Sequence, residues 1–303
     1  MTTTTSDVAT STRRKRTRSE IEARVFGILK WVSIVFFLVI TVFPLVYMIG
    51  LSFKPISELL QNPGNFLPSW NDLTSLDTYR EVLRPVEDGG QGFFTFIRNS
   101  VIVALATMIV TVFLAIFAAY AAARLRFSGR KFVTWVILIV YLFPAVVIAI
   151  PLFVLFSRLG IRNSLFGLAI VYVAQTIPVA LYMLRSYFQT VPAELEEAAL
   201  VDGLSRTGVI WRVTIPLAAP AIAAVALYVF MIAWNEFLFA LLFLTESRDL
   251  WTLPLGVQQL DSTEVPVTLL MAGSVIITVP VVVLFFAAER FLTEGLTAGG
   301  VKG

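Results

Sequence analysis

The sequence predicts an all-α, polytopic membrane protein with six transmembrane helices and a cytoplasmic helix-turn-helix loop between the fourth and fifth. Hydrophobic residues make up 58% of the 303 residues and charged residues 14%, whereas soluble domains carry about 25% charged residues. Six apolar runs reach the roughly 20 residues that a helix needs to cross a bilayer: 31–53, 99–123, 132–157, 163–184, 217–245 and 267–288. They show no strand-like alternation, so we expect helices rather than a barrel.

The regions outside these runs define the expected organisation. Residues 1–26 form a Thr/Ser-rich, basic tail that we expect to be disordered. The first apolar run is longer than the 7–15 residues of a cleavable signal sequence, so it is interpreted as an uncleaved span. The six-span domain is placed at 27–291, with its large loop at 189–216, and a C-terminal tail at 292–303.

The basic residues orient the chain. The N-terminal tail and the loop after the second run, which holds Arg124, Arg126, Arg130 and Lys131, are the richest in arginine and lysine. The positive-inside rule places both in the cytoplasm, and six spans return the C-terminus there too. Arg158 and Arg162 are an exception, because this topology puts them outside. The tail's basic cluster favours anchoring to anionic lipid over nucleic-acid binding.

The composition excludes most catalytic chemistry. The chain contains no cysteine and no histidine, which removes disulfides, thiolate nucleophiles, the commonest metal ligands and the usual near-neutral acid-base group. No phosphate-binding GxxxxGK[ST] motif occurs. We therefore expect no catalytic residue, no metal site and no cofactor bound by this chain.

The loop at 189–216 is the chemically distinctive segment, because the acidic stretch EEAALVDG interrupts apolar sequence there. Pro192 suits a helix start, Gly203 a helix C-cap, and Ser205 the cap of a second helix. Small side chains at Ala198 and Ala199 permit close approach of another surface. Three interpretations remain open on this evidence: an interfacial hairpin, a catalytic carboxylate pair, or a docking element for a soluble partner.

The spacing of the loop resembles a family motif. Glu197, Ala198 and Ala199 are followed after three residues by Gly203, and then by Val213-Thr214-Ile215-Pro216. This resembles the EAA loop, EAA-x3-G-x9-I-x-L-P, of binding-protein-dependent ABC importer permeases. Val213 and Ile215 replace the usual isoleucine and leucine and keep branched apolar side chains. The stretch from Ala233 to Phe237 and the Gly-rich ending from Gly295 resemble the maltose-type sugar permeases, specifically the smaller, six-span partner.

The resemblance implies a sugar importer of the bacterial or archaeal cytoplasmic membrane. This chain would pair with a second, homologous permease subunit, with two ATP-binding subunits that carry ATP and Mg, and with an extracytoplasmic sugar-binding protein that delivers a di- or oligosaccharide. A permease for a glycerol phosphate or polyol is the alternative, and a non-ABC secondary transporter is a further rival. The residues expected to couple to the ATPase are Glu197, Ala198, Ala199, Asp202, Gly203, Val213, Ile215 and Pro216.

Polar and aromatic residues within the spans are candidates for the solute pathway. Asn235 and Glu236 interrupt the fifth apolar run, and an intramembrane carboxylate is a functional-site candidate. Interhelical hydrogen bonding is the simpler explanation for both. The other candidates can hold a sugar by stacking or hydrogen bonding, although each can equally be a packing residue: Tyr141, Tyr172, Gln175, Tyr182 and Tyr228.

Overall fold

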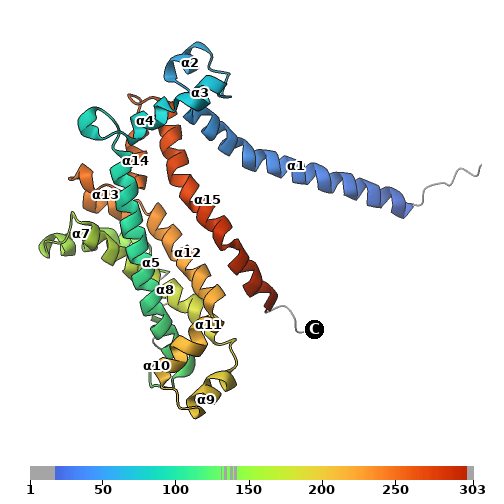
Figure 1. The fold of residues 1–303 in the computed structure, drawn as a ribbon, viewed down its shortest axis with the longest axis vertical. Coiled ribbons are helices and arrows are strands. Elements are labelled where there is room, and N and C mark those ends of the chain that lie inside the picture. The colour runs from blue at the N-terminus through green and yellow to red at the C-terminus, as the bar shows by residue number, and fades with distance from the viewer. Residues whose placement is uncertain (1–17, 131, 133–134, 137–138, 140–141, 299–303) are drawn as a thin grey trace, which may run out of the picture. The chain divides into compact units, whose positions relative to one another are not determined.

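The computed structural model describes residues 18–298 except 131, 133–134, 137–138 and 140–141, and these residues form helices without a strand. The first eight elements are α1 (Arg18–Ser52), α2 (Ile56–Gln61), α3 (Trp70–Ser75), α4 (Asp77–Leu83), η1 (Val86–Asp88), α5 (Phe93–Arg124), α7 (Ala145–Arg158) and α8 (Leu165–Phe188). The rest are α9 (Ala193–Val201), α10 (Arg206–Val209), η2 (Ile210–Thr214), α11 (Ile215–Leu217), α12 (Ala219–Asn235), α13 (Leu238–Leu244), η3 (Arg248–Leu250), α14 (Leu253–Leu260) and α15 (Val267–Ala298). The all-α prediction is confirmed (Figure 1).

The chain divides at Ile49 into two compact units. The first unit contains most of α1, whose apolar side chains are exposed on all sides of the helix. Such a helix suits a lipid or protein environment rather than water. It begins at Arg18, so residues 18–26, expected in the disordered tail, are helical. Glu22 and Arg24 are exposed in the first turns of this helix.

Four helices are long and apolar enough to cross a membrane within the described part of the chain. They are Arg24–Ser52, Phe93–Arg124, Leu165–Phe188 and Val267–Glu289, and a fifth appears if Arg206–Leu217 and Ala219–Asn235 count as one broken span. These two segments are bent by 82°, as expected if a loop helix meets a span near Leu217. The third apolar run includes residues outside the described ranges. Its described helix, α7, has 14 residues, which is fewer than a span needs. The six-span count therefore stays a prediction.

The fifth apolar run, 217–245, is not one helix. α12 ends at Asn235, the backbone of Glu236 is extended, and α13 starts at Leu238. The Glu236 carboxylate accepts hydrogen bonds from the backbone nitrogens of Phe239 (3.0 Å) and Ala240 (3.4 Å) in the first turn of α13. A hydropathy pattern cannot detect this break, because the side chain that supports it lies within an otherwise continuous apolar run.

The core of the second unit is built on α5, which packs along α8 and α12, while α12 also packs on α15. Close approach of α5 and α8 is possible because Ala115, Ala119 and Ala180 are fully buried at their contact. The hydroxyls of Thr111 and Thr176 lie 2.9 Å apart and join the two helices by a buried hydrogen bond. Helices that lack water as a competitor gain from such small-residue contacts and interhelical hydrogen bonds.

The last helix is longer than predicted. α15 continues through Ala298, so residues 292–298, expected in a tail without helical pattern, extend the helix. Their side chains, and residues 299–303, lie outside the described set. The prediction relied on the glycines beyond Glu294, but one glycine costs a helix only about 1 kcal/mol relative to alanine, and a helix already 28 residues long carries it.

Candidate coupling site and transmembrane cavity

The segment 189–216 folds as a helix, a turn and a second helix. α9 is followed by the turn Asp202-Gly203-Leu204 and then by α10, η2 and α11. Figure 1 shows α9 and α10 together at one end of the bundle formed by α5, α8 and α12. The predicted helix-hinge-helix arrangement is therefore present in the structure.

The sequence rules that predicted this turn act as expected. Gly203 has φ +89°, its N–H donates to the carbonyl of Leu200 (3.1 Å), and the N–H of Leu204 donates to the carbonyl of Ala199 (3.0 Å). These two bonds define a Schellman C-cap, which favours glycine. The Ser205 hydroxyl accepts from the N–H of Gly208 (3.2 Å) and caps the second helix. Pro192 lies immediately before α9 rather than inside its first turn.

The outer surface of the loop is open. Glu197, Ala198, Asp202 and Gly203 are exposed and Ala199 is half-buried. Around them stand exposed apolar side chains, namely Leu195 (47%), Leu200 (36%), Val201 (87%) and Trp211 (54%). Within the part of the chain that the structure describes, the Glu197 carboxylate makes no hydrogen bond or ion pair. An acidic residue beside a small, apolar patch is suited to contact a partner surface.

The last residues of the motif lie in the segment that leads from the loop into the helix bundle. Val213 and Ile215 are half-buried, and Pro216 is exposed in the short α11. Ile215 packs against the buried cluster of α5, α8 and α12. Residues 210–214 form a turn of π-helix, a rare geometry that is frequent at functional sites. The motif thus joins an exposed helix to a segment that is packed into the bundle.

Sequence reasoning missed the neighbour of the motif glutamate. Glu196 is 5% exposed, and its carboxylate bonds to Arg124 and Thr214. The motif spacing identifies Glu197, which faces out, whereas Glu196 faces in. Its partner Arg124 lies 72 residues away in the chain, so no local pattern signals the pairing.

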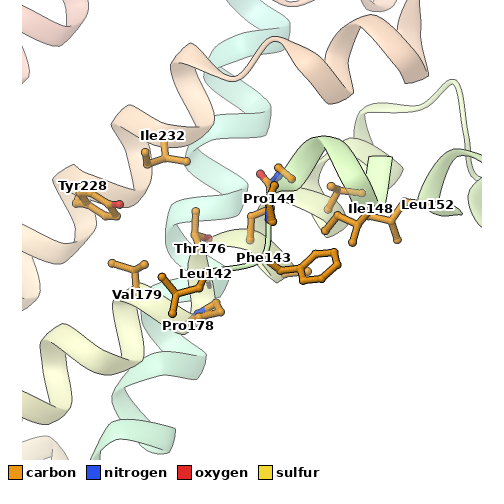
Figure 2. A pocket seen from close by; sticks show the side chains of 14 residues that line it. Leu142, Phe143, Pro144, Ile148, Leu152, Thr176, Pro178, Val179, Tyr228 and Ile232 are labelled. Atoms are coloured by element: carbon orange, nitrogen blue, oxygen red, sulfur yellow. The ribbon is translucent and has the colours of Figure 1, made fainter. Parts of the chain in front are cut away.

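A cavity of about 580 Å³ lies between α7, α8 and α12. Figure 2 shows Tyr228 and Ile232 of α12 on one side, Ile148 and Leu152 of α7 on the other, and Thr176 and Val179 of α8 between them. Its lining includes Gln175 and contains no charged side chain among the described residues. The cavity can accept a neutral solute with apolar and hydroxyl groups.

The cavity unites two of the candidate pathway residues, Gln175 and Tyr228. Tyr182 is 49% exposed on α8 and does not line it. Tyr172 is buried in the core, where its hydroxyl donates to the backbone oxygen of Glu236 (3.4 Å). Tyr141 lies outside the described residues.

Asn235 and Glu236 have structural partners. The Asn235 side chain donates to the carbonyl of Met231 (2.8 Å), and Glu236 holds the start of α13 as described above. Neither residue lines the cavity. These side-chain bonds are local, within α12 and at the start of α13, rather than the interhelical bonds expected from the sequence, so a role of either residue in the pathway stays a prediction.

A family model describes the region that contains both features. Residues 111–296 match the binding-protein-dependent transport system inner membrane component family. The chain belongs to this family. The matched region begins in α5, includes the whole of the 189–216 loop, and ends in α15. The exposed EAA helix is therefore part of an inner-membrane permease.

Relatives extend the match over nearly the whole permease. The inner membrane ABC transporter permease protein YcjP of Escherichia coli K12 is 41% identical over 269 residues, 88% of this chain and 93% of YcjP. The trehalose/maltose transport system permease protein MalG of Thermococcus litoralis is 35% identical over 94% of this chain and 99% of MalG. The arabinooligosaccharides transport system permease protein AraQ of Halalkalibacterium halodurans is 33% identical over 91% and 98%.

A solved structure has the same fold. A chain of a bacterial ABC transporter involved in the import of the acidic polysaccharide alginate superposes with a TM-score of 0.75 and 24% sequence identity. The superposition covers 91% of this permease and 98% of that chain. The permease fold therefore extends beyond the segment that the family model matches.

Proposed function

We propose that this permease forms half of the translocation pathway of an ATP-driven, binding-protein-dependent importer of a di- or oligosaccharide. It pairs with a second permease subunit, receives the sugar from an extracytoplasmic binding protein, and contacts an ATP-hydrolysing subunit through the surface of α9. The permease itself has no catalytic role. The observation that carries the proposal is the exposed EAA helix within a chain whose similar proteins include trehalose/maltose and arabinooligosaccharide permeases.

The distribution of arginine supports a cytoplasmic position for α9 and both termini. Arg124, Arg126 and Arg130 lie at the end of α5 nearest α9. The exceptional Arg162 is paired, because its guanidinium donates to Glu246 at 2.8 Å and lies 4.9 Å above the Phe153 ring. Arg162 therefore stays an exception to the positive-inside rule, in which the larger clusters of arginine decide the orientation.

The α9 surface supports docking onto an ATPase subunit over the two competing interpretations of the loop. An interfacial hairpin needs a basic polar face, whereas α9 exposes Glu194 and Glu197. Catalysis by paired carboxylates needs an enclosed pocket, and Glu197 is exposed while Glu196 is engaged by Arg124. A short exposed helix with alanines and apolar side chains can enter a cleft on a partner protein.

The cavity supports a neutral solute. Its lining offers the Tyr228 ring, the amide of Gln175 and apolar side chains, and no cation to pair with a phosphate among the described residues. Sugars present apolar ring faces and hydroxyl groups that such a surface accommodates. This favours a sugar over the alternative of a glycerol phosphate.

Crosslinking tests the docking proposal, because the chain has no native cysteine. A single Ala199→Cys permease, purified with its ATP-binding subunit, should crosslink to a cysteine in that subunit, and the yield should change with nucleotide. The matched control is Phe94→Cys, at the far end of α5 and 69% exposed, which should give no such crosslink. Absence of a crosslink at Ala199 and at exposed neighbours in a complex that hydrolyses ATP would refute docking through α9.

Uptake tests the substrate and the energy source together. Proteoliposomes containing the whole complex and the binding protein should accumulate a labelled di- or oligosaccharide only when ATP is supplied on the side of the ATPase. A panel that includes trehalose, maltose, a polyol and glycerol 3-phosphate separates the solute classes. Uptake driven by a proton or sodium gradient without ATP would instead support a secondary transporter.

A further inference from the structure

Four segments meet at the end of α5. These are the last turn of α5 itself, the linker that connects α8 to α9, the helix α9, and the π-turn η2. They meet at Arg124, Glu196 and Thr214, which we call the anchor cluster. Neither the EAA motif nor the candidate pathway residues include these three side chains.

The three side chains of the anchor cluster are joined by hydrogen bonds to one another and to the backbone. Arg124 donates from Nε to Glu196 Oε2 (3.1 Å) and from Nη2 to the backbone oxygen of Val191 (2.7 Å). Thr214 donates from Oγ1 to Glu196 Oε1 (3.1 Å). Both carboxylate oxygens are thus used, and one guanidinium holds both α9 and the linker that precedes it. A planar guanidinium supports two bonds in fixed directions, which a lysine ammonium does not.

The cluster is enclosed. The side chains of Arg124 and Glu196 are 15% and 6% exposed, and Thr214 is fully buried. The buried Tyr120 side chain, one helical turn before Arg124, also faces the Glu196 carboxylate. Removing one member of a buried ion pair leaves the other charge without compensation, so such a pair strongly favours a single arrangement of the elements that carry it.

Without the anchor cluster, α9 has a flexible connection at each end. After α9 comes Gly203, a residue whose backbone has a wide choice of conformations. Before α9 comes the non-helical linker of residues 189–192. A force applied to the exposed face of α9 would turn the helix about these two points. The bonds of Glu196 and Val191 to Arg124 oppose that rotation, because they attach α9 and the linker to a 32-residue helix.

We propose that the anchor cluster is a positioning site that makes α9 and α5 move as one body, so that a displacement of α9 by a partner reaches the transmembrane helices. The inference rests on the proposed function, in which that partner is the ATPase subunit. The two adjacent glutamates have different roles. Glu197 faces the partner, and Glu196, about 100° away around the helix, faces Arg124. The π-turn places Thr214 beside the same carboxylate. It is followed directly by α11, which leads into the next span, α12.

Pulsed EPR distances test this inference in the complete complex. Spin labels are placed at Ala193→Cys, the exposed first residue of α9, and at Phe94→Cys, near the opposite end of α5. A helix of 32 residues spans roughly 48 Å, which suits the method. Distances are recorded without nucleotide and after trapping with ATP and vanadate. In the parent protein the distance should be narrow and the same in both states.

The variants break the anchor cluster in two ways. Glu196→Ala removes the carboxylate, and Thr214→Val removes the hydroxyl at similar volume. Both should broaden the distance distribution and make its mean shift on trapping, more so for Glu196→Ala, while Glu196→Gln, which keeps an acceptor for Arg124, should restore much of the narrow distribution. The matched control is Arg162→Ala, which breaks an ion pair of similar length elsewhere and should leave the distance unchanged.

The outcomes distinguish a failure of this inference from a failure of the proposed function. If the ATP-binding subunit co-purifies and is trapped by vanadate, but Glu196→Ala and Thr214→Val keep the parent's narrow, unchanging distance, the anchor cluster has no positioning role and docking survives. A parent distance that shifts on trapping overturns the inference in the same way. If no ATP-binding subunit co-purifies with the parent permease, the proposed function and this inference fall together.

Discussion

Substitutions at Gly203 distinguish two effects: backbone strain in the turn, and a steric clash between the new side chain and a partner. The residue has φ +89°, and an added Cβ would have nothing within 4 Å in this chain. A side chain there therefore adds no clash inside the permease, and its cost is the left-handed backbone alone, about 1–2 kcal/mol. That corresponds to a factor of about 5–30 in the population of the native turn.

Gly129 provides a matched control, because it has φ +88° and equally open surroundings. Gly203→Ala and Gly129→Ala should lower stability by similar small amounts, since both add only backbone strain. Gly203→Leu should add a second effect, a loss of co-purifying ATP-binding subunit and of ATPase activity, because the added side chain projects into the space that the partner occupies. Gly129→Leu should retain both.

The assay is ATPase activity and subunit stoichiometry of the complex purified through a tag on the permease, with thermal unfolding measured on the same samples. Equal loss in Gly203→Leu and Gly129→Leu would mean that strain alone explains both. Full stoichiometry and activity in Gly203→Leu would show that the turn does not face the ATP-binding subunit, and would refute the reasoning.

Three further substitutions test contacts that hold the helices in place, each by thermal unfolding of the purified complex. Glu236→Ala should destabilise the start of α13 by about 1–3 kcal/mol, because two backbone N–H groups lose their acceptor; Glu236→Gln, which keeps an acceptor, should lose less. Asn99→Ala should cost a similar amount, since its buried amide donates to the carbonyls of Asp249 (2.8 Å) and Trp251 (2.9 Å). Gly256→Ala should cost about 1–3 kcal/mol by overpacking, because the new Cβ would lie 2.4 Å from the Phe96 ring. Parent-like unfolding temperatures in any of the three would contradict the contact concerned.

The sequence predicts the 189–216 loop well because its signals are local. A glycine at positive φ, a serine cap and a proline before a helix each act over four or five residues, and Gly203, Ser205 and Pro192 are found close to their expected roles. The all-α class follows equally directly from composition. These features need no knowledge of which segments meet in space.

Two of the features that were not predicted depend on long-range contacts, and a third, the break at Glu236, is local but does not show in the hydropathy pattern. The break at Glu236 follows from one carboxylate that bonds backbone nitrogens three and four residues ahead, and hydropathy treats that residue as a minor interruption. Tyr172 was a reasonable pathway candidate by residue type, yet packing places it in the core. The choice between Glu196 and Glu197 as the inward residue is made by Arg124, a partner that only the fold brings near.

Polar bonds between segments hold both ends of the second unit, and a largely apolar cavity lies between these ends. At one end, Arg162 and Asn163, before α8, bond to Glu246 and Ser247, after α13. At the other, the anchor cluster ties α5 to the loop into which α8 leads. Between these ends, the Thr111–Thr176 hydrogen bond joins α5 to α8, and the sides of the cavity that α7 and α12 provide are mostly apolar side chains, whose attraction is non-directional. Apolar surfaces can slide with little loss, whereas directional bonds resist movement, so we expect a change in cavity shape to occur by displacement of α7 and α12 against α8 while both bonded ends move as units.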